Sequence, residues 1–215
     1  TLTGDVTFAA GADLITTTAG TSNLRLGVDA GTNLASGSTG NTFVGDNAGK
    51  DNTTGDNNAA VGKGALENNT TASNNTAVGY ASLSANTTGA SNIAVGTYSL
   101  DSNTTGASNT AVGTYSLGAN TTGANLVGLG YGVLYANTTA ANNTGVGYFA
   151  LGNNTTGASN VAVGALALDA NTTASNNTAV GDGSLGTNTT GASNTAVGKG
   201  ALENNTTANA NVAVG

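Results

Sequence analysis

The side chains that could carry out chemistry in this chain are few, and their types exclude most catalytic sites. The sequence of 215 residues contains no histidine, cysteine or methionine. Its 11 acidic residues occur singly at variable places, so no base recurs beside the many serine and threonine hydroxyls. Calcium-binding glycine repeats need an acid in every unit, which is absent here. We therefore expect no enzymatic activity, no cofactor and no metal site.

One pattern with chemical meaning is the tripeptide Asn-Thr-Thr, which recurs throughout the chain. Because Asn-x-Thr is the acceptor pattern for N-glycosylation, a glycosylating host could decorate the chain along one edge. Asparagines stacked on one another in a repeating turn would instead form a ladder of amide hydrogen bonds, and for a protein made by a host that does not glycosylate it we prefer this interpretation. The asparagines concerned are Asn52, Asn69, Asn86, Asn103, Asn120, Asn137, Asn154, Asn171, Asn188 and Asn205.

A second candidate group consists of aromatic side chains. They gather in neighbouring copies of a repeat that is described below, and four of the seven occupy positions where other copies carry charged residues, so we expect the group to be exposed. Such a cluster could stack on sugar rings or hold a partner, or it could pack against a neighbouring chain or over an adjacent turn. The group comprises Tyr80, Tyr98, Tyr115, Tyr131, Tyr135, Tyr148 and Phe149.

A repeat of 17 residues must position all of these side chains. The dipeptide Val-Gly marks each unit from Val44 to Val214, with Leu129 as the one substitution, and no insertion interrupts the series. We number this valine as position 0 of its unit. Position 1 is then always glycine, position 5 is leucine from Leu66 to Leu202, and position 8 is the asparagine of Asn-Thr-Thr. A fixed period of this length is typical of a solenoid.

The residues around each valine favour a β-strand. Position 15 is β-branched in ten of eleven copies, and position 16 is nearly always alanine or glycine. We expect the valine, the leucine and the β-branched residue in the core, with the alanine and glycine face against a partner chain. Positions 6 to 13 are rich in turn-forming residues, so each unit is predicted to form two short strands and two turns. The fold class is therefore an all-β parallel β-solenoid.

Two segments follow from the extent of the repeat. Residues 44–215 are predicted to form ten stacked units, and residues 1–43 an irregular β cap or a junction with a preceding domain. Within the latter, residues 26–31 echo residues 44–49 at a spacing of 18 and form a degenerate unit. The chain begins without Met and ends inside a repeat, so we expect it to be a piece of a longer polypeptide.

The low content of large apolar residues bears on partners. A thin coil that buries few large side chains in each unit is marginal alone, so we expect self-association as a homotrimer or homopolymer. The net charge of −7 argues against nucleic acid and anionic membrane surfaces as partners. No apolar run is long enough to span a bilayer, so we expect no membrane insertion in this segment.

The unit at residues 75–91, Asn-Thr-Ala-Val-Gly-Tyr-Ala-Ser-Leu-Ser-Ala-Asn-Thr-Thr-Gly-Ala-Ser, resembles the repeats of trimeric autotransporter adhesin heads and of bacteriophage tail fibres. The resemblance covers about residues 43–215. Those adhesin heads carry a Ser-Val-Ala-Ile-Gly-like strand, but their commoner unit is shorter, which brings this chain nearer to the tail-fibre versions. The resemblance implies a left-handed, trimeric β-roll that projects from a surface.

These observations lead to one preferred function and two alternatives. The preferred function is the shaft or head of a trimeric extracellular adhesive fibre, on a virion or a bacterial surface, that binds a glycan or protein receptor of a host. The first alternative is an architectural extracellular filament, glycosylated at Asn-Thr-Thr. The second alternative is an ice-binding solenoid, since the chain has a regular array of threonines. It is the weaker one, because the adjacent threonines of Asn-Thr-Thr lie in a predicted turn and not in Thr-x-Thr rows on a strand.

Overall fold

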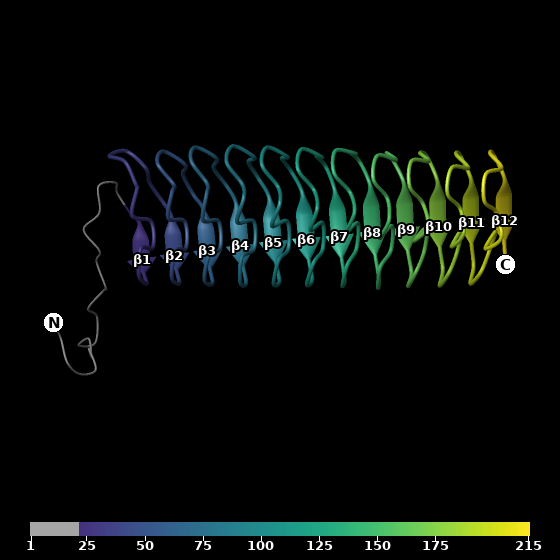
Figure 1. Ribbon diagram of the computed structural model, residues 1–215, viewed down its shortest axis with the longest axis horizontal. Coiled ribbons are helices and arrows are strands. Elements are labelled where there is room, and N and C mark those ends of the chain that lie inside the picture. The colour runs from purple at the N-terminus through teal and green to yellow at the C-terminus, as the bar shows by residue number, and fades with distance from the viewer. Residues whose placement is uncertain (1–21) are drawn as a thin grey trace, which may run out of the picture.

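The computed structural model describes residues 22–215, which form a rod of stacked coils (Figure 1). Twelve strands lie in sequence order in one sheet, every pair of neighbours is parallel, and these residues contain no helix. The predicted all-β parallel β-solenoid is confirmed. The strands are β1 (Leu24–Leu26), β2 (Thr42–Val44), β3 (Ala59–Val61), β4 (Thr76–Val78), β5 (Ile93–Val95), β6 (Thr110–Val112), β7 (Val127–Leu129), β8 (Thr144–Val146), β9 (Val161–Val163), β10 (Thr178–Val180), β11 (Thr195–Val197) and β12 (Val212–Val214).

The register of the sheet follows the period of the sequence. Thr76 of β4 lies opposite Ile93 of β5, and Val78 lies opposite Val95, 17 residues further along the chain. The same step joins β2 to β3 and β11 to β12, so each position of the unit forms a column along the rod. With neighbouring strands ~4.8 Å apart, the stack is roughly 53 Å long.

The stack begins earlier than the sequence predicts. Strand β1 pairs with β2, with Leu24 opposite Thr42 and Leu26 opposite Val44, across a coil of 18 residues. The additional residue lies between the two strands, so it leaves the pairing register unchanged. Residues 22–43 of the predicted cap thus form a coil of the same stack, with the spacing of 18 that the degenerate unit at residues 26–31 has, while residues 1–21 of the predicted cap lie outside the described part.

Each coil contains one strand of three residues, where two strands were predicted. The second strand was expected near the leucine of position 5, but that leucine has a left-handed backbone, with φ of 55° at Leu66 and 50° at Leu100. This conformation cannot continue an extended strand and is unfavourable for leucine. Burial offsets the cost, because both side chains are fully buried.

The two faces of each strand are the reverse of those predicted. Ala77 and Ala94, the middle residues of β4 and β5, are fully buried, whereas Val78 and Ile93 are 37% and 43% exposed. In a strand of three residues, the middle side chain points to one side of the sheet and the two end side chains point to the other. Burial of the middle alanine therefore places the β-branched residue and the valine on the outer side. The narrow interior accommodates alanine beside the leucine column. The predicted burial of the valine and the β-branched residue is therefore wrong.

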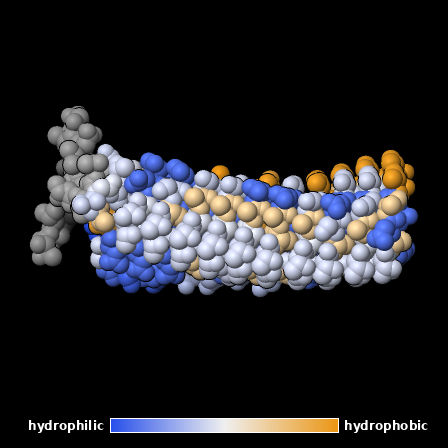
Figure 2. All heavy atoms as spheres, turned by 90° about the horizontal axis from the view of Figure 1, so that it is seen from above, coloured by the Kyte–Doolittle hydropathy of each residue, from blue (hydrophilic) through white to orange (hydrophobic). Residues whose placement is uncertain are grey.

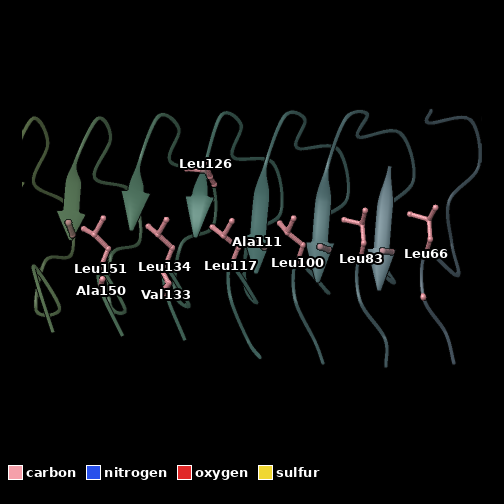
Figure 3. Close-up of a cluster of buried hydrophobic side chains, with 14 of the residues drawn as sticks. Leu66, Leu83, Leu100, Ala111, Leu117, Leu126, Val133, Leu134, Ala150 and Leu151 are labelled. Atoms are coloured by element: carbon pink, nitrogen blue, oxygen red, sulfur yellow. The ribbon is translucent and has the colours of Figure 1, made fainter. Parts of the chain in front are cut away.

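The core is a column of leucines with alanine beside it. Figure 3 shows Leu66, Leu83, Leu100 and Leu117 pointing the same way from successive coils. The side chains of positions 16 and 5 fill the same part of the interior. In the one coil where Phe43 replaces the alanine of position 16, Gly49 replaces the leucine of position 5. A Cβ on that glycine would lie 2.5 Å from the phenylalanine ring. The single exception to leucine at position 5 is thus a compensated exchange of volume.

Candidate functional site

The asparagines of Asn-Thr-Thr form a continuous hydrogen-bonded ladder. Nδ2 of Asn69 donates to Oδ1 of Asn52 at 2.6 Å, and Nδ2 of Asn86 donates to Oδ1 of Asn69 at 2.8 Å. The same bond recurs at every step up to Asn205. The other Nδ2 proton of Asn69 is donated to the carbonyl of Ala72, at 2.9 Å. From Asn69 to Asn205, both amide protons of each asparagine are therefore used within the coil stack.

This geometry leaves no place for a glycan on the folded coils. The asparagines from Asn52 to Asn188 are fully buried. An N-linked glycan would replace one Nδ2 proton and would leave a buried acceptor without its donor. Asn205, in the last coil, is less buried but still donates to Asn188 and to Ala208. The structure thus supports the ladder interpretation of Asn-Thr-Thr.

Sequence reasoning missed a second asparagine column, at position 14. Oδ1 of Asn58 accepts from the backbone N–H of Asn75 at 2.9 Å, and Nδ2 of Asn58 donates to the carbonyl of Ala72 at 2.9 Å. That carbonyl also accepts from Asn69, so the two columns share an acceptor. The available signal was an asparagine directly before nearly every strand, interrupted by Leu126. The coils are therefore joined by polar side chains as well as by the backbone.

The two threonines of each Asn-Thr-Thr have different roles. The hydroxyl of Thr70 donates to the carbonyl of Thr87 at 3.0 Å, and that of Thr87 donates to Thr104 at 3.0 Å. The following threonines, such as Thr71 and Thr88, are exposed. The first threonine thus joins adjacent coils, and only the second is presented to solvent.

The seven candidate aromatic side chains form one strip along the flank of the rod. Rings at the same position of adjacent coils lie parallel, as in Tyr98 and Tyr115, whose centroids are 5.4 Å apart. Rings at different positions of adjacent coils stand at right angles, as Tyr80 does to Tyr98, at 5.3 Å. The contacts continue through the remaining rings to Phe149. Five of the tyrosines are 37% to 57% exposed, so the strip is accessible in this chain.

Four rings of the aromatic strip line a pocket of about 190 Å³ at Gly132. This glycine occupies position 3, where the preceding coil has Tyr115 and the following coil has Phe149. Tyr131 and Tyr135 flank it within its own coil. A Cβ on Gly132 would lie 2.7 Å from the Phe149 ring, so the glycine is needed for this ring to lie across its backbone. The pocket combines rings from three successive coils.

Acidic groups lie near the aromatic strip. Asp101 and Tyr135 both lie beside Gly118. A Cβ on this glycine would be 3.3 Å from the ring of Tyr135 and 3.5 Å from Oδ1 of Asp101. Burial raises the pKa of Asp101 and of Asp169, and backbone hydrogen bonds offset only part of that effect. The pKa of Tyr98 is also raised, chiefly by its side-chain hydrogen bond with Tyr80.

The outward side of the sheet, at positions 15 and 0 of each coil, is the outer strand face. Most of its valines are exposed, at 40% for Val61, 38% for Val112 and 39% for Val197, while Val95 and Val146 are partly buried. No charged residue occupies either column from β1 to β12. In the view of Figure 2, weakly hydrophobic residues follow the length of the rod, and strongly hydrophobic residues lie at intervals along its upper edge. A continuous apolar surface therefore follows the rod axis.

Comparisons of the chain with protein-family models, with curated proteins and with solved structures give no match. Over residues 22–215, no group of three or more histidine, cysteine or acidic residues is placed to hold a metal ion. The same part of the chain has no helix with the length and apolar character needed to cross a membrane. The outer strand face and the aromatic strip are therefore the candidate functional surfaces of the described residues.

Proposed function

We propose that the chain is a segment, shaft or head, of an extracellular adhesive fibre in which three copies pack along their length. Such fibres include bacteriophage tail fibres and bacterial surface adhesins. The observation that carries this proposal is the outer strand face, which presents two uncharged, largely apolar columns along the whole sheet. Extended apolar surfaces of this kind are typical of protein interfaces. The number three comes from the resemblance of the repeat.

The parallel sheet itself favours a covered outer face. In α/β proteins, parallel sheets have both faces buried, and their strands are rich in apolar residues on both sides. Here the inner face is covered by the leucine column, with Ala77 and Ala94 fully buried, while Val78 and Ile93 on the outer face meet solvent in a single chain. Side-by-side packing of copies would bury this face and would supply the apolar burial that one thin coil lacks.

The interior of the rod suits a fibre segment. In-register backbone pairing and the asparagine ladder repeat at each coil, so every coil is held by its two neighbours. In such solenoids each repeat contacts only adjacent repeats, and the array can be long without a larger core. The rod can therefore act as a spacer while its flank presents side chains to a receptor.

The mass of the native assembly in dilute buffer, measured by light scattering, tests this function. We expect the mass of three chains. The variant Val112→Lys would place a charge in the middle of the outer strand face, and we expect it to dissociate the assembly. Thr122→Lys, at an exposed turn position of the same unit, is the matched control and should keep the native mass. A single-chain mass for the unchanged protein would refute the proposal, and open-ended polymers would favour the architectural filament.

One observation favours ice binding as a second candidate. Thr76, Thr110 and Thr144 lie on strands, each two residues before a valine of the outer strand face. The sequence-based objection considered only the threonines of Asn-Thr-Thr, and it does not apply to this face. Regular spacing on a straight sheet would allow an ordered array of methyl and hydroxyl groups. Thermal hysteresis of the native protein tests this candidate, since an assembly that covers the face should show none.

A further inference from the structure

The rings at Gly132 stand in an arrangement suited to enclosing a compact group. Tyr131 and Tyr135 are both near perpendicular to Tyr115, at 88° and 90°, and each has its centroid 6.2 Å from it. At this separation the perpendicular rings form T-shaped pairs. A cation that lies over the face of an aromatic ring within ~6 Å of its centroid gains a cation–π interaction. Phe149 of the next coil is the fourth wall.

The lining of the pocket has little hydrogen-bonding capacity. It consists of Tyr115, Tyr131, Gly132, Tyr135 and Phe149. Beyond the glycine backbone, its polar groups are three phenol hydroxyls. A sugar ring presents several hydroxyls, and sites that recognise such ligands place polar side chains around them. The lining is therefore better matched to a ligand that has apolar surface and donates no hydrogen bond.

The surrounding charge favours a cation. The four basic residues of the chain are Arg25, Lys50, Lys63 and Lys199, so residues 64–198 contribute none. Asp101 adjoins Tyr135 at Gly118, and the net charge of the whole chain is −7. A cationic ligand at Gly132 would meet no basic side chain of residues 64–198 and would be attracted by the acidic rod.

We propose that the pocket at Gly132 binds a quaternary ammonium group, the chemistry shared by choline headgroups and trimethylated lysine. Its methyl groups would contact the four ring walls, and its charge would interact with the electron-rich ring faces. A quaternary nitrogen has no N–H group, so the ligand leaves no hydrogen bond unmade in a pocket with few acceptors. The inference names the receptor chemistry of the fibre proposed above and rests on that proposal.

The test is a titration of the native assembly with choline chloride, followed through tyrosine fluorescence, since the chain has no tryptophan. The neutral isostere 3,3-dimethylbutanol has the same shape without the charge, and sodium chloride controls for ionic strength. We expect choline to bind about two- to thirtyfold more tightly than the isostere, the factor that a cation–π contribution implies. Methyl glucoside should bind more weakly than choline.

Two matched variants locate the site. Tyr131→Thr removes a wall of the pocket, whereas Tyr80→Thr changes a tyrosine at the same position of another coil, outside the pocket lining. The two side chains are equally exposed, at 49% and 48%. Threonine already occupies this position as Thr97 and Thr114, so both variants should fold. We expect at least a tenfold loss of choline affinity in Tyr131→Thr and unchanged affinity in Tyr80→Thr.

Several results would overturn the inference. These are equal binding of choline and its isostere, binding of methyl glucoside without choline, or the same loss in both variants. Vesicles of phosphatidylcholine and a trimethyl-lysine peptide then identify the source of the group, because each presents it on a different carrier. An assembly of three chains that ignores choline refutes only this inference, whereas a monomer that binds choline refutes only the fibre.

Discussion

Replacing Asn120 by alanine in the middle of the ladder should cost far more than its small loss of volume suggests. Its Nδ2 donates to Oδ1 of Asn103 at 2.8 Å and to the carbonyl of Gly123 at 3.1 Å, and its Oδ1 accepts from Asn137 at 2.9 Å. Asn120 is fully buried. Asn120→Ala removes three hydrogen bonds, and water cannot replace them without entering the coil.

The size of the effect follows from the partners that remain. The carbonyl of Gly123 keeps the bond from Asn109 at 2.8 Å, so it is still satisfied. Oδ1 of Asn103 and one Nδ2 proton of Asn137 lose their partners in the interior. Each unsatisfied buried polar group costs ~1–3 kcal/mol, so we expect a loss of roughly 2–6 kcal/mol in the free energy of unfolding. Thr122→Ala, at an exposed turn position two residues away, should change it by less than about 0.5 kcal/mol.

The assay should resolve individual coils, because repeat arrays need not unfold in one step. Amide hydrogen exchange of the native protein serves this purpose, with guanidinium unfolding followed by circular dichroism as the global measure. We expect faster exchange in Asn120→Ala in the coils around Asn103 and Asn137, and little change near β2 or β11. If Asn120→Ala and Thr122→Ala had equal effects, the ladder would be unimportant for stability and the reasoning would be refuted.

Three further predictions follow from other columns. Gly96→Ala should unfold the rod or its central coils, because φ at Gly96 is 132° and the added Cβ would lie 2.7 Å from the backbone of the next coil. Gly183 has open space around it, so Gly183→Ala should lower the free energy of unfolding by only about 1 kcal/mol in a chemical unfolding experiment. Leu100→Ala should lower the free energy of unfolding by ~2–5 kcal/mol in the same experiment, and a loss below 1 kcal/mol would contradict the fully buried leucine column. Because burial raises the pKa of Asp101 and Asp169 above 3.8, their contribution favours folding at acid pH and is lost as the pH rises through the raised pKa. The double variant Asp101→Asn and Asp169→Asn should therefore flatten the pH dependence of the melting temperature, and an unchanged profile would show that these groups do not set it.

The period of 17 was enough to predict the solenoid, the parallel register and the columns, because one repeated unit can only stack on itself. It was not enough to assign the faces of each strand. Alternation shows that Ala77 and Val78 point to opposite sides, but hydrophobicity alone assigned the larger residue to the interior. The actual interior is filled by leucine in a left-handed backbone conformation, as at Leu83, which sequence patterns rarely predict.

The candidate residues were predicted as groups, but their arrangement was not. Counting tyrosines by position placed them together, yet the pocket depends on the absence of a side chain at Gly132 between Tyr115 and Phe149. A glycine in a glycine-rich repeat gives no signal of its own. It becomes informative only when the 17-residue columns are aligned and its neighbours above and below are found to be aromatic.

The columns also separate the outer strand face from the aromatic strip. Positions 15 and 0 form the outer strand face, while the aromatic strip uses positions 2, 3 and 6 beyond the glycine of position 1. That glycine has φ of 132° in the coil of Tyr98 and 128° in that of Tyr115, a conformation that L side chains rarely adopt. The chain therefore turns away from the sheet before it reaches the rings. If copies associate through the strand face, the pocket at Gly132 lies on different columns from the interface, and a variant such as Tyr131→Thr should change ligand binding without changing the mass of the assembly.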